Sequence, residues 1–174
     1  APRGEKYFVF YNPPVVNREL GIRQSSLKAA RDISAELIRS GIQTIVFAPS
    51  RTRVELLLTY LRDSLRNKPG DPERVTGYRG GYLPNERRAV EKGLRDGTVR
   101  GVVATNALEL GIDIGGLGAS VVTGYPGSLA SLWQQFGRAG RSREAALSVL
   151  VASSNPLDQF VATHPDFVFE GAVE

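Results

Sequence analysis

Cysteine is absent from this 174-residue chain, and histidine occurs once, at His164. Without cysteine, neither a disulfide framework nor a thiolate metal site can form. A single histidine is also too few for the usual zinc or non-haem iron ligand sets, so we expect no metal site. The apolar runs are much shorter than a bilayer span, so no membrane partner is expected.

The sequence also lacks the motifs that hold a nucleoside triphosphate. It contains no G-x-x-x-x-G-K-[ST], because no glycine is followed by lysine, and it has no Asp-Glu pair of a Walker B motif. The phosphate-cradling loop, its lysine and the Mg²⁺-binding carboxylate are therefore missing. We expect no meaningful ATPase activity from this chain alone.

What is present suits one globular domain with a sizeable core. Hydrophobic residues make up 41% of the chain and charged residues 23%, an ordinary balance for a globular protein. The formal net charge is +4 and the pI is about 9.6. This positive charge weakly favours a polyanionic partner.

Short β-branched runs alternate with longer amphipathic runs, which predicts an α/β domain with a mainly parallel central sheet. Strands are expected over residues 6–12, 44–48, 74–78, 99–105, 119–124 and 146–152. Helices are expected over residues 26–39, after Ser50, from Pro84 to Gly97 and after Ser128. We assign residues 1–154 to this domain. Residues 155–174 are expected to form a short helix and a tail leading toward a following module that the chain lacks.

Polar residues gather where the strand at 99–105 ends. Ligands of open parallel sheets bind outside the carboxyl ends of strands. The hydroxyl of Thr105 and nearby helix-start amides suit a phosphate, and the carboxylate of Asp113 suits a ribose hydroxyl. A helix cap at Thr105 and a turn at Asp113 explain the same residues equally well, so both interpretations stay open at this point.

The stretch QQFGRAGR, residues 134–141, places Arg138 and Arg141 each directly after a glycine. Glycine lets the backbone approach a ligand closely, and a guanidinium is a planar, permanently charged phosphate ligand. The alternative is a solvated basic helix end, where cations favour the helix dipole. The pattern modestly favours phosphate binding.

Two further stretches carry similar groups. Residues 77–88 follow a strand with Gly80 and Gly81, whose amides suit a phosphate backbone, and with Arg79 and Arg87. Residues 47–53 contain Ser50, Arg51 and Arg53, although a capped helix with a charged first turn is the simpler explanation there. Because the carboxyl ends of parallel strands share one edge, we expect all four stretches to meet at that edge.

In order and spacing, these stretches resemble the second RecA-like motor domain of superfamily 2 helicases, over essentially the whole chain. TIVFAPSR resembles motif IV, YRGGYLPNERR the conserved loop after it, ATNALELGIDI motif V and QQFGRAGR motif VI. The flanking stretches NPPVVNRELGIRQSS, GYPGSLASLWQQFGRAGR and NPLDQFVATHPDF resemble the YprA/MrfA group of bacterial DNA helicases, relatives of the yeast Hrq helicase. The resemblance implies a three-layer α/β/α RecA-like fold.

The resemblance also implies roles for individual residues in an ATP-dependent, 3′-to-5′ DNA helicase linked to DNA repair. Arg141 and Arg138 are arginine fingers for ATP, Gln134 positions the nucleotide, and Gly111 and Asp113 complete the nucleotide site, with Asp113 accepting from the ribose 3′-hydroxyl. Glu109 fits the motif without an assigned role. The tracked strand contacts Ser50, Arg51, Arg79, Gly80, Gly81, Thr105 and Asn106. Many relatives have His-Gly where this chain has Tyr78-Arg79-Gly80-Gly81, which leaves the strand contacts of that loop open.

The implied cofactor is ATP with Mg²⁺, which is held mainly by the N-terminal RecA-like domain of the same protein. That domain and a single-stranded nucleic acid, taken as DNA by resemblance, are the expected partners. We interpret the chain as an excised C-terminal motor domain, active only within the full-length enzyme. Such an enzyme is expected in the cytoplasm with the bacterial nucleoid, or in the nucleus of a eukaryote.

Two other classes explain parts of the sequence. A stand-alone nucleic-acid-binding module accounts for the basic charge and the missing Walker motifs, but not for the presence of both motif V and motif VI. A Rossmann-type enzyme would use VVTGYPGS, residues 121–128, as its phosphate turn. No G-x-G-x-x-G follows a strand in this sequence, which argues against that class.

Overall fold

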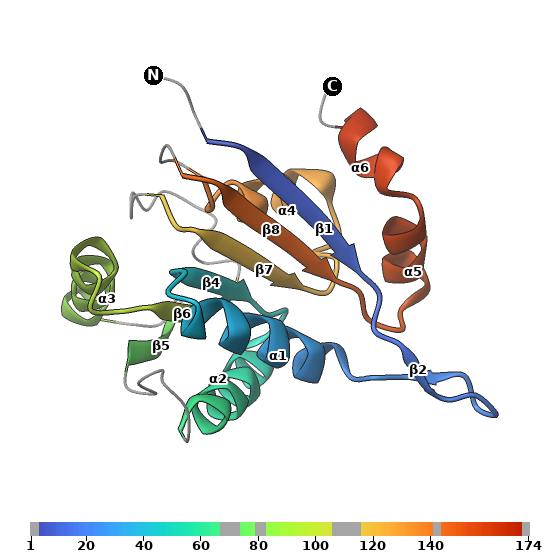
Figure 1. Ribbon diagram of the computed structural model, residues 1–174, viewed down its shortest axis with the longest axis horizontal. Coiled ribbons are helices and arrows are strands. Elements are labelled where there is room, and N and C mark those ends of the chain that lie inside the picture. Colours follow the sequence, from blue (N-terminus) through green and yellow to red (C-terminus); the bar gives the residue numbers. More distant parts are fainter. Residues whose placement is uncertain (1–3, 67–73, 79–82, 106–115, 141–143, 172–174) are drawn as a thin grey trace.

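A six-stranded sheet forms the centre of the protein (Figure 1). The computed structural model describes residues 4–66, 74–78, 83–105, 116–140 and 144–171. The strand order is β1-β8-β7-β4-β6-β5, and every pairing in this sheet is parallel. The strands are β1 (Lys6–Tyr11), β4 (Thr44–Phe47), β5 (Val75–Tyr78), β6 (Gly101–Ala104), β7 (Ala119–Thr123) and β8 (Ala146–Val151). The expected mainly parallel sheet is therefore confirmed.

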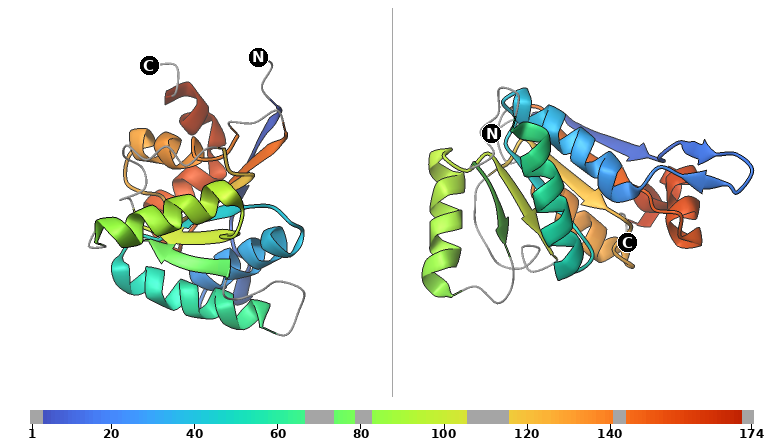
Figure 2. Two further views of the ribbon diagram at one scale, coloured as in Figure 1. Left: turned by 90° about the vertical axis from the view of Figure 1, so that its left-hand side faces the viewer. Right: turned by 90° about the horizontal axis from the view of Figure 1, so that it is seen from below.

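Helices cover both faces of the sheet (Figure 2). One face packs against α1 (Ser26–Arg39) and α2 (Arg51–Leu65), and the other against α3 (Pro84–Asp96) and α4 (Leu129–Phe136). Ile45 and Phe47 of β4 belong to the core under α3 and α4, whereas Val46 belongs to the core under α1 and α2. Coverage of both faces explains why the strands are continuous apolar runs. No helix in the described ranges is long and apolar enough to cross a membrane.

Local sequence sets the ends of these helices. The hydroxyl of Ser50 accepts from the Arg53 N–H at 3.2 Å, and that of Ser128 accepts from the Ser131 N–H at 3.1 Å. These are ordinary serine N-caps, as predicted. Gly97 ends α3 with φ of 81°, a left-handed conformation that glycine adopts without steric cost.

A separate antiparallel hairpin projects from the domain (Figure 2, right). It consists of β2 (Val15–Asn17) and β3 (Ile22–Arg23), and it was not expected from the sequence. Its turn contains Gly21 with φ of 65°, and the Leu20 N–H donates to Oδ1 of Asn17 at 3.1 Å. The turn residues Asn17 and Gly21 were the available signal for a hairpin.

The C-terminal segment holds two helices where one was expected, α5 (Pro156–Thr163) and α6 (Pro165–Gly171). Both pack on the domain, because Val161 and Val168 are fully buried in the same core as α4. The indole Nε1–H of Trp133 also donates to the Val168 carbonyl at 3.3 Å. The division of the chain after residue 154 stays a prediction.

Candidate nucleic-acid interface

Three of the four predicted stretches meet at the carboxyl edge of the sheet. Phe47 at the end of β4 and Tyr78 at the end of β5 both pair with Ala104 at the end of β6. The Ala48 N–H continues this ladder by donating to the Ala104 carbonyl at 2.9 Å. Thr105 and Ser50 therefore follow neighbouring strands at one edge, as the sequence predicted.

The start of α2 is exposed at this edge. Ser50, Arg51 and Arg53 are all exposed, and the first turn of α2 contains no acidic residue. A helix N-terminus carries partial positive charge and unpaired amides, which suit an anion. Ser50 is thus a helix cap, as the simpler explanation held, and it stands at a place suited to a phosphate. Thr105 is half-buried behind it.

Arg87 adds a cation to the same edge. It lies in the second turn of α3, which begins beyond the end of β5. Its Nε–H donates to the Tyr78 hydroxyl at 2.8 Å, and its guanidinium carbon lies 5.9 Å from the Tyr78 ring centre. The hydrogen bond to Tyr78 raises the pKa of Arg87 above its usual range. Arg87 was predicted from the sequence as a cation of this stretch. Its hydrogen bond to Tyr78 was not predicted.

Arg138 lies at the opposite edge, so the expectation that all four stretches share one edge was wrong. The stretch follows a helix rather than a strand, and α4 runs back from the carboxyl edge toward the amino edge. The Leu117 N–H donates to the Arg138 carbonyl at 3.3 Å, just before β7 begins. Arg138 is only 7% exposed, which rules out the solvated basic helix end.

The two glutamines of the same stretch differ in position. Gln134 is exposed, whereas Gln135 is 1% exposed and faces the sheet with Leu132 and Phe136. The Ser120 hydroxyl donates to the main-chain carbonyl of Gln135 at 2.8 Å. Gln135 was not predicted as a buried residue, although its spacing from Leu132 marks the buried side of the helix.

Several predicted site residues lie outside the described residues, and their roles stay predictions. In the strand-contacting set they are Arg79, Gly80, Gly81 and Asn106. In the nucleotide set they are Gly111, Asp113 and Arg141, and Glu109 lies outside as well.

Comparisons with known proteins identify the family. The model of the helicase conserved C-terminal domain matches residues 27–143, which is more than half of the chain. The chain is 51% identical over its whole length to the ATP-dependent helicase YprA of Bacillus subtilis, of which it covers 23%. It is 39% identical over 98% of its length to the ATP-dependent helicase HRQ1 of Saccharomyces cerevisiae, of which it covers 16%.

A solved structure agrees with these relatives. The crystal structure of the DUF1998 helicase MrfA bound to DNA superposes with a TM-score of 0.93, at 52% identity, over 98% of this chain and 23% of that one. The chain thus spans about a quarter of the relatives it matches, or less. Its fold is the expected three-layer α/β/α RecA-like arrangement. The chain belongs to the helicase conserved C-terminal domain family of superfamily 2, in the group that contains YprA, MrfA and HRQ1.

Proposed function

We propose that this chain is the C-terminal motor half of an ATP-dependent DNA helicase that moves 3′-to-5′ and serves DNA repair. The observation that carries the proposal is the separation of two sets of groups. Exposed phosphate-binding groups line the carboxyl edge of the sheet, while the arginine of the helicase motif lies at the amino edge. Relatives of this chain are ATP-dependent helicases, and MrfA has been crystallised bound to DNA.

The carboxyl edge contacts the phosphates of the tracked strand. The hydroxyl of Ser50 and the first N–H groups of α2 donate hydrogen bonds to one phosphate, and Arg51 adds positive charge beside it. Thr105 contributes a hydroxyl from the neighbouring strand end. The hydrogen bond to Tyr78 orients the Arg87 guanidinium. The predicted contacts of Arg79, Gly80, Gly81 and Asn106 belong to the same proposal.

The amino edge supplies the arginine fingers. Arg138 and Arg141 approach ATP bound with Mg²⁺ on the N-terminal RecA-like domain, with Gln134, Gly111 and Asp113 completing the nucleotide site. Arginine fingers stabilise charge on the transferring γ-phosphoryl group and are worth ~10³–10⁵ in rate. The main chain of Arg138 is fixed to Leu117 before ATP arrives. A group positioned in advance needs little reorganisation in the transition state.

Stepping follows from the use of both edges. ATP bridges the two motor domains and closes the cleft between them, and hydrolysis removes the γ-phosphate contact so that the cleft opens. Each domain then tightens on the strand in turn. Because the contacts are mainly to phosphates, the grip depends on charge more than on base sequence.

The experiment measures ATP hydrolysis by the chain alone and mixed with the first motor domain of its parent, each with and without single-stranded DNA. We expect no turnover alone and DNA-stimulated turnover in the mixture, lost in Arg141→Ala. Steady turnover by the chain alone that Arg141→Ala abolishes contradicts the proposal. An inactive covalently linked two-domain protein that still binds DNA favours the stand-alone binding module.

A further inference from the structure

A cavity of about 310 Å³ opens at the carboxyl edge, next to the proposed strand contacts. It lies where β4 and β7 end, beside the start of α5. Pro49, which directly precedes Ser50, forms part of its wall. The lining residues are Phe47, Ala48, Pro49, Thr123, Gly124, Tyr125, Pro126, Gly127, Gln135, Asn155, Leu157 and Asp158.

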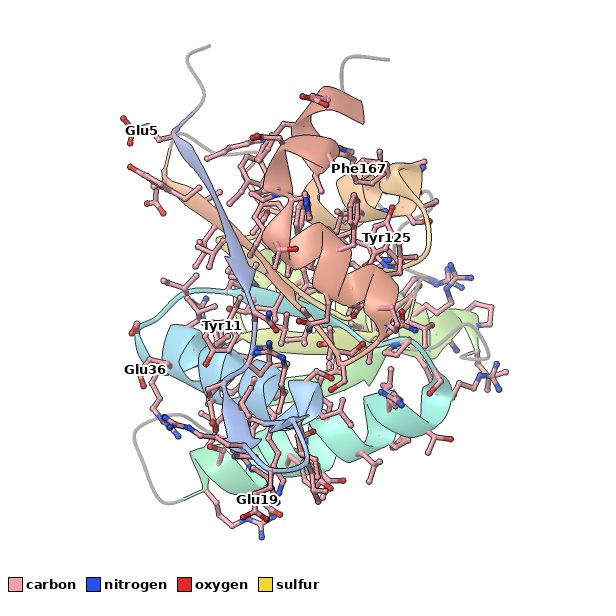
Figure 3. All side chains as sticks on the ribbon, turned by 90° about the vertical axis from the view of Figure 1, so that its right-hand side faces the viewer. Glu5, Tyr11, Glu19, Glu36, Tyr125 and Phe167 are labelled. Carbon is pink, nitrogen blue, oxygen red and sulfur yellow. The ribbon has the colours of Figure 1, made fainter. Side chains whose placement is uncertain are left out.

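The wall of this cavity combines apolar and polar surface. The half-buried Tyr125 and Pro126, with the exposed Pro49 and Leu157, supply rings and aliphatic surface. Figure 3 shows Tyr125 beside α5, and the Tyr125 N–H donates to Oδ2 of Asp158 on that helix at 3.2 Å. Aromatic and proline surfaces of this kind suit a planar ring.

Two buried polar residues also line the cavity. Gln135 is 1% exposed, so it adds almost no surface that an occupant can reach. Asp158 is 5% exposed, and its Oδ2 is held by the N–H groups of Ser153, at 2.8 Å, and Tyr125. These bonds tie the loops after β7 and β8 to α5, so the cavity has a fixed frame.

The charge of the lining excludes a phosphate as the occupant. Asp158 supplies the one carboxyl group among the described lining residues, and none of them is a lysine or arginine that could attract a phosphate. The volume is at the lower end of the ~300–1,000 Å³ typical of ligand sites. The occupant that fits is small, planar, uncharged and capable of hydrogen bonding.

We propose that this cavity accepts an unpaired nucleobase of the strand whose phosphates contact Ser50. The inference rests on the proposed function, because that function brings a single strand to this edge. A base turned out of the stack finds the rings of Tyr125, Pro49 and Pro126 to pack against. The motor domain then holds its strand by a base as well as by phosphates.

The test uses NMR titration of the 174-residue chain with thymidine and adenosine, which carry no phosphate, and with a single-stranded DNA. We expect all three probes to shift the amide signals of Tyr125, Gly127 and Ser153. Leu157→Trp fills the rim of the cavity and abolishes these shifts. The control Leu56→Trp makes the same change at a similarly exposed residue of α2 outside the cavity and preserves them.

The outcomes separate this inference from the function on which it rests. If single-stranded DNA shifts the amides of residues 50–53 but neither DNA nor nucleosides shift those of the cavity, the base site is refuted and the strand grip stands. If nucleosides enter the cavity but DNA binds nowhere on the chain, the proposed function fails and a strand base is not the occupant. Unchanged nucleoside shifts in Leu157→Trp also overturn the inference. Thermal melting of both variants confirms that they are folded.

Discussion

Leu117 and Arg138 are joined through their main chains at the amino edge of the sheet. The Leu117 N–H donates to the Arg138 carbonyl at 3.3 Å, and the Leu117 carbonyl accepts from the Gly140 N–H at 3.0 Å. The helicase motif is thus bonded to the residues that lead into β7. Its backbone position is set by the sheet and not by α4 alone.

Gly140 is a position in this stretch that does not accommodate a side chain. Its φ is 96°, and an added Cβ would lie 2.9 Å from Lys6 Cε and 3.0 Å from Ala146 Cβ. Gly140→Ala therefore combines a left-handed backbone, costing ~1–2 kcal/mol, with a clash against β8. Gly41→Ala is the control, because its φ is 82° and nothing lies within 4 Å. Urea unfolding should show a larger loss for Gly140→Ala, and equal losses would contradict this account.

Arg138→Lys separates the geometry of a guanidinium from its charge. In the two-domain protein we expect a fall in single-turnover ATP hydrolysis approaching the ~10³ attributed to arginine fingers, since an ammonium cannot reproduce the planar fork. The control is Arg39→Lys, which alters a partly buried arginine bonded to the Ser64 carbonyl at 2.7 Å. Arg39→Lys should change the melting temperature without changing the rate. A rate loss in Arg138→Lys no larger than in the control refutes the finger role.

Ser50→Asp tests the strand grip without removing the helix cap. Aspartate is as good an N-cap as serine, so the stability of the domain should change little. Its charge repels phosphate, so affinity for single-stranded DNA should fall several-fold in a fluorescence anisotropy titration. Ser40→Asp adds the same charge at the end of α1, at the amino edge, and should leave affinity nearly unchanged. Equal effects of the two variants would show that only net charge matters.

Asp96 makes the stability of the domain depend on acid pH. Its Oδ1 accepts from the Thr98 hydroxyl at 2.7 Å and the Thr98 N–H at 2.9 Å, and these bonds lower the pKa of Asp96. The unfolded chain then binds the proton more readily, so this stability is present above the ordinary aspartate pKa of ~3.9 and is lost as pH falls through the lower, folded value.

Thr98→Val removes the bond that the Thr98 hydroxyl donates to Asp96. We expect it to lower the melting temperature most near pH 7 and progressively less as pH falls below the ordinary aspartate pKa. Thr59→Val removes a hydroxyl that donates to the Glu55 carbonyl at 2.9 Å, where no carboxylate takes part. Its effect should not vary with pH in the same way. A pH-independent effect of Thr98→Val would rule out the assigned cause.

The sequence predicted the elements of the sheet well because their signals are local. Apolar runs placed the six strands, and Ser50, Ser128 and Gly97 marked helix ends through contacts within a few residues. The hairpin at Val15–Arg23 was missed because its large apolar side chains are exposed, so no buried pattern marks it. The docking of α6 depends on Trp133 and Phe8, which are distant in the sequence.

The candidate site also contains residues whose positions were predicted correctly from the sequence and residues whose positions were not. The carboxyl ends of neighbouring parallel strands must lie together, so Ser50 and Thr105 could be placed from the sequence. The prediction for Arg138 was wrong because its stretch follows a helix, and a helix that joins two parallel strands returns the chain to the amino edge. The orientation of Arg87 by Tyr78 comes from packing between elements, which residue type alone does not specify.

The pairing of β1 with β8 constrains how the chain is assembled during synthesis. Lys6 leaves the ribosome well before Ala146, which is its neighbour in the sheet. Until β8 emerges, β1 has no strand beside it, and Phe8 and Phe10 lack the Phe136 ring that they later meet. The interior strands β4, β6 and β7 have all been synthesised by then. The nascent domain therefore closes last at the edge that was translated first.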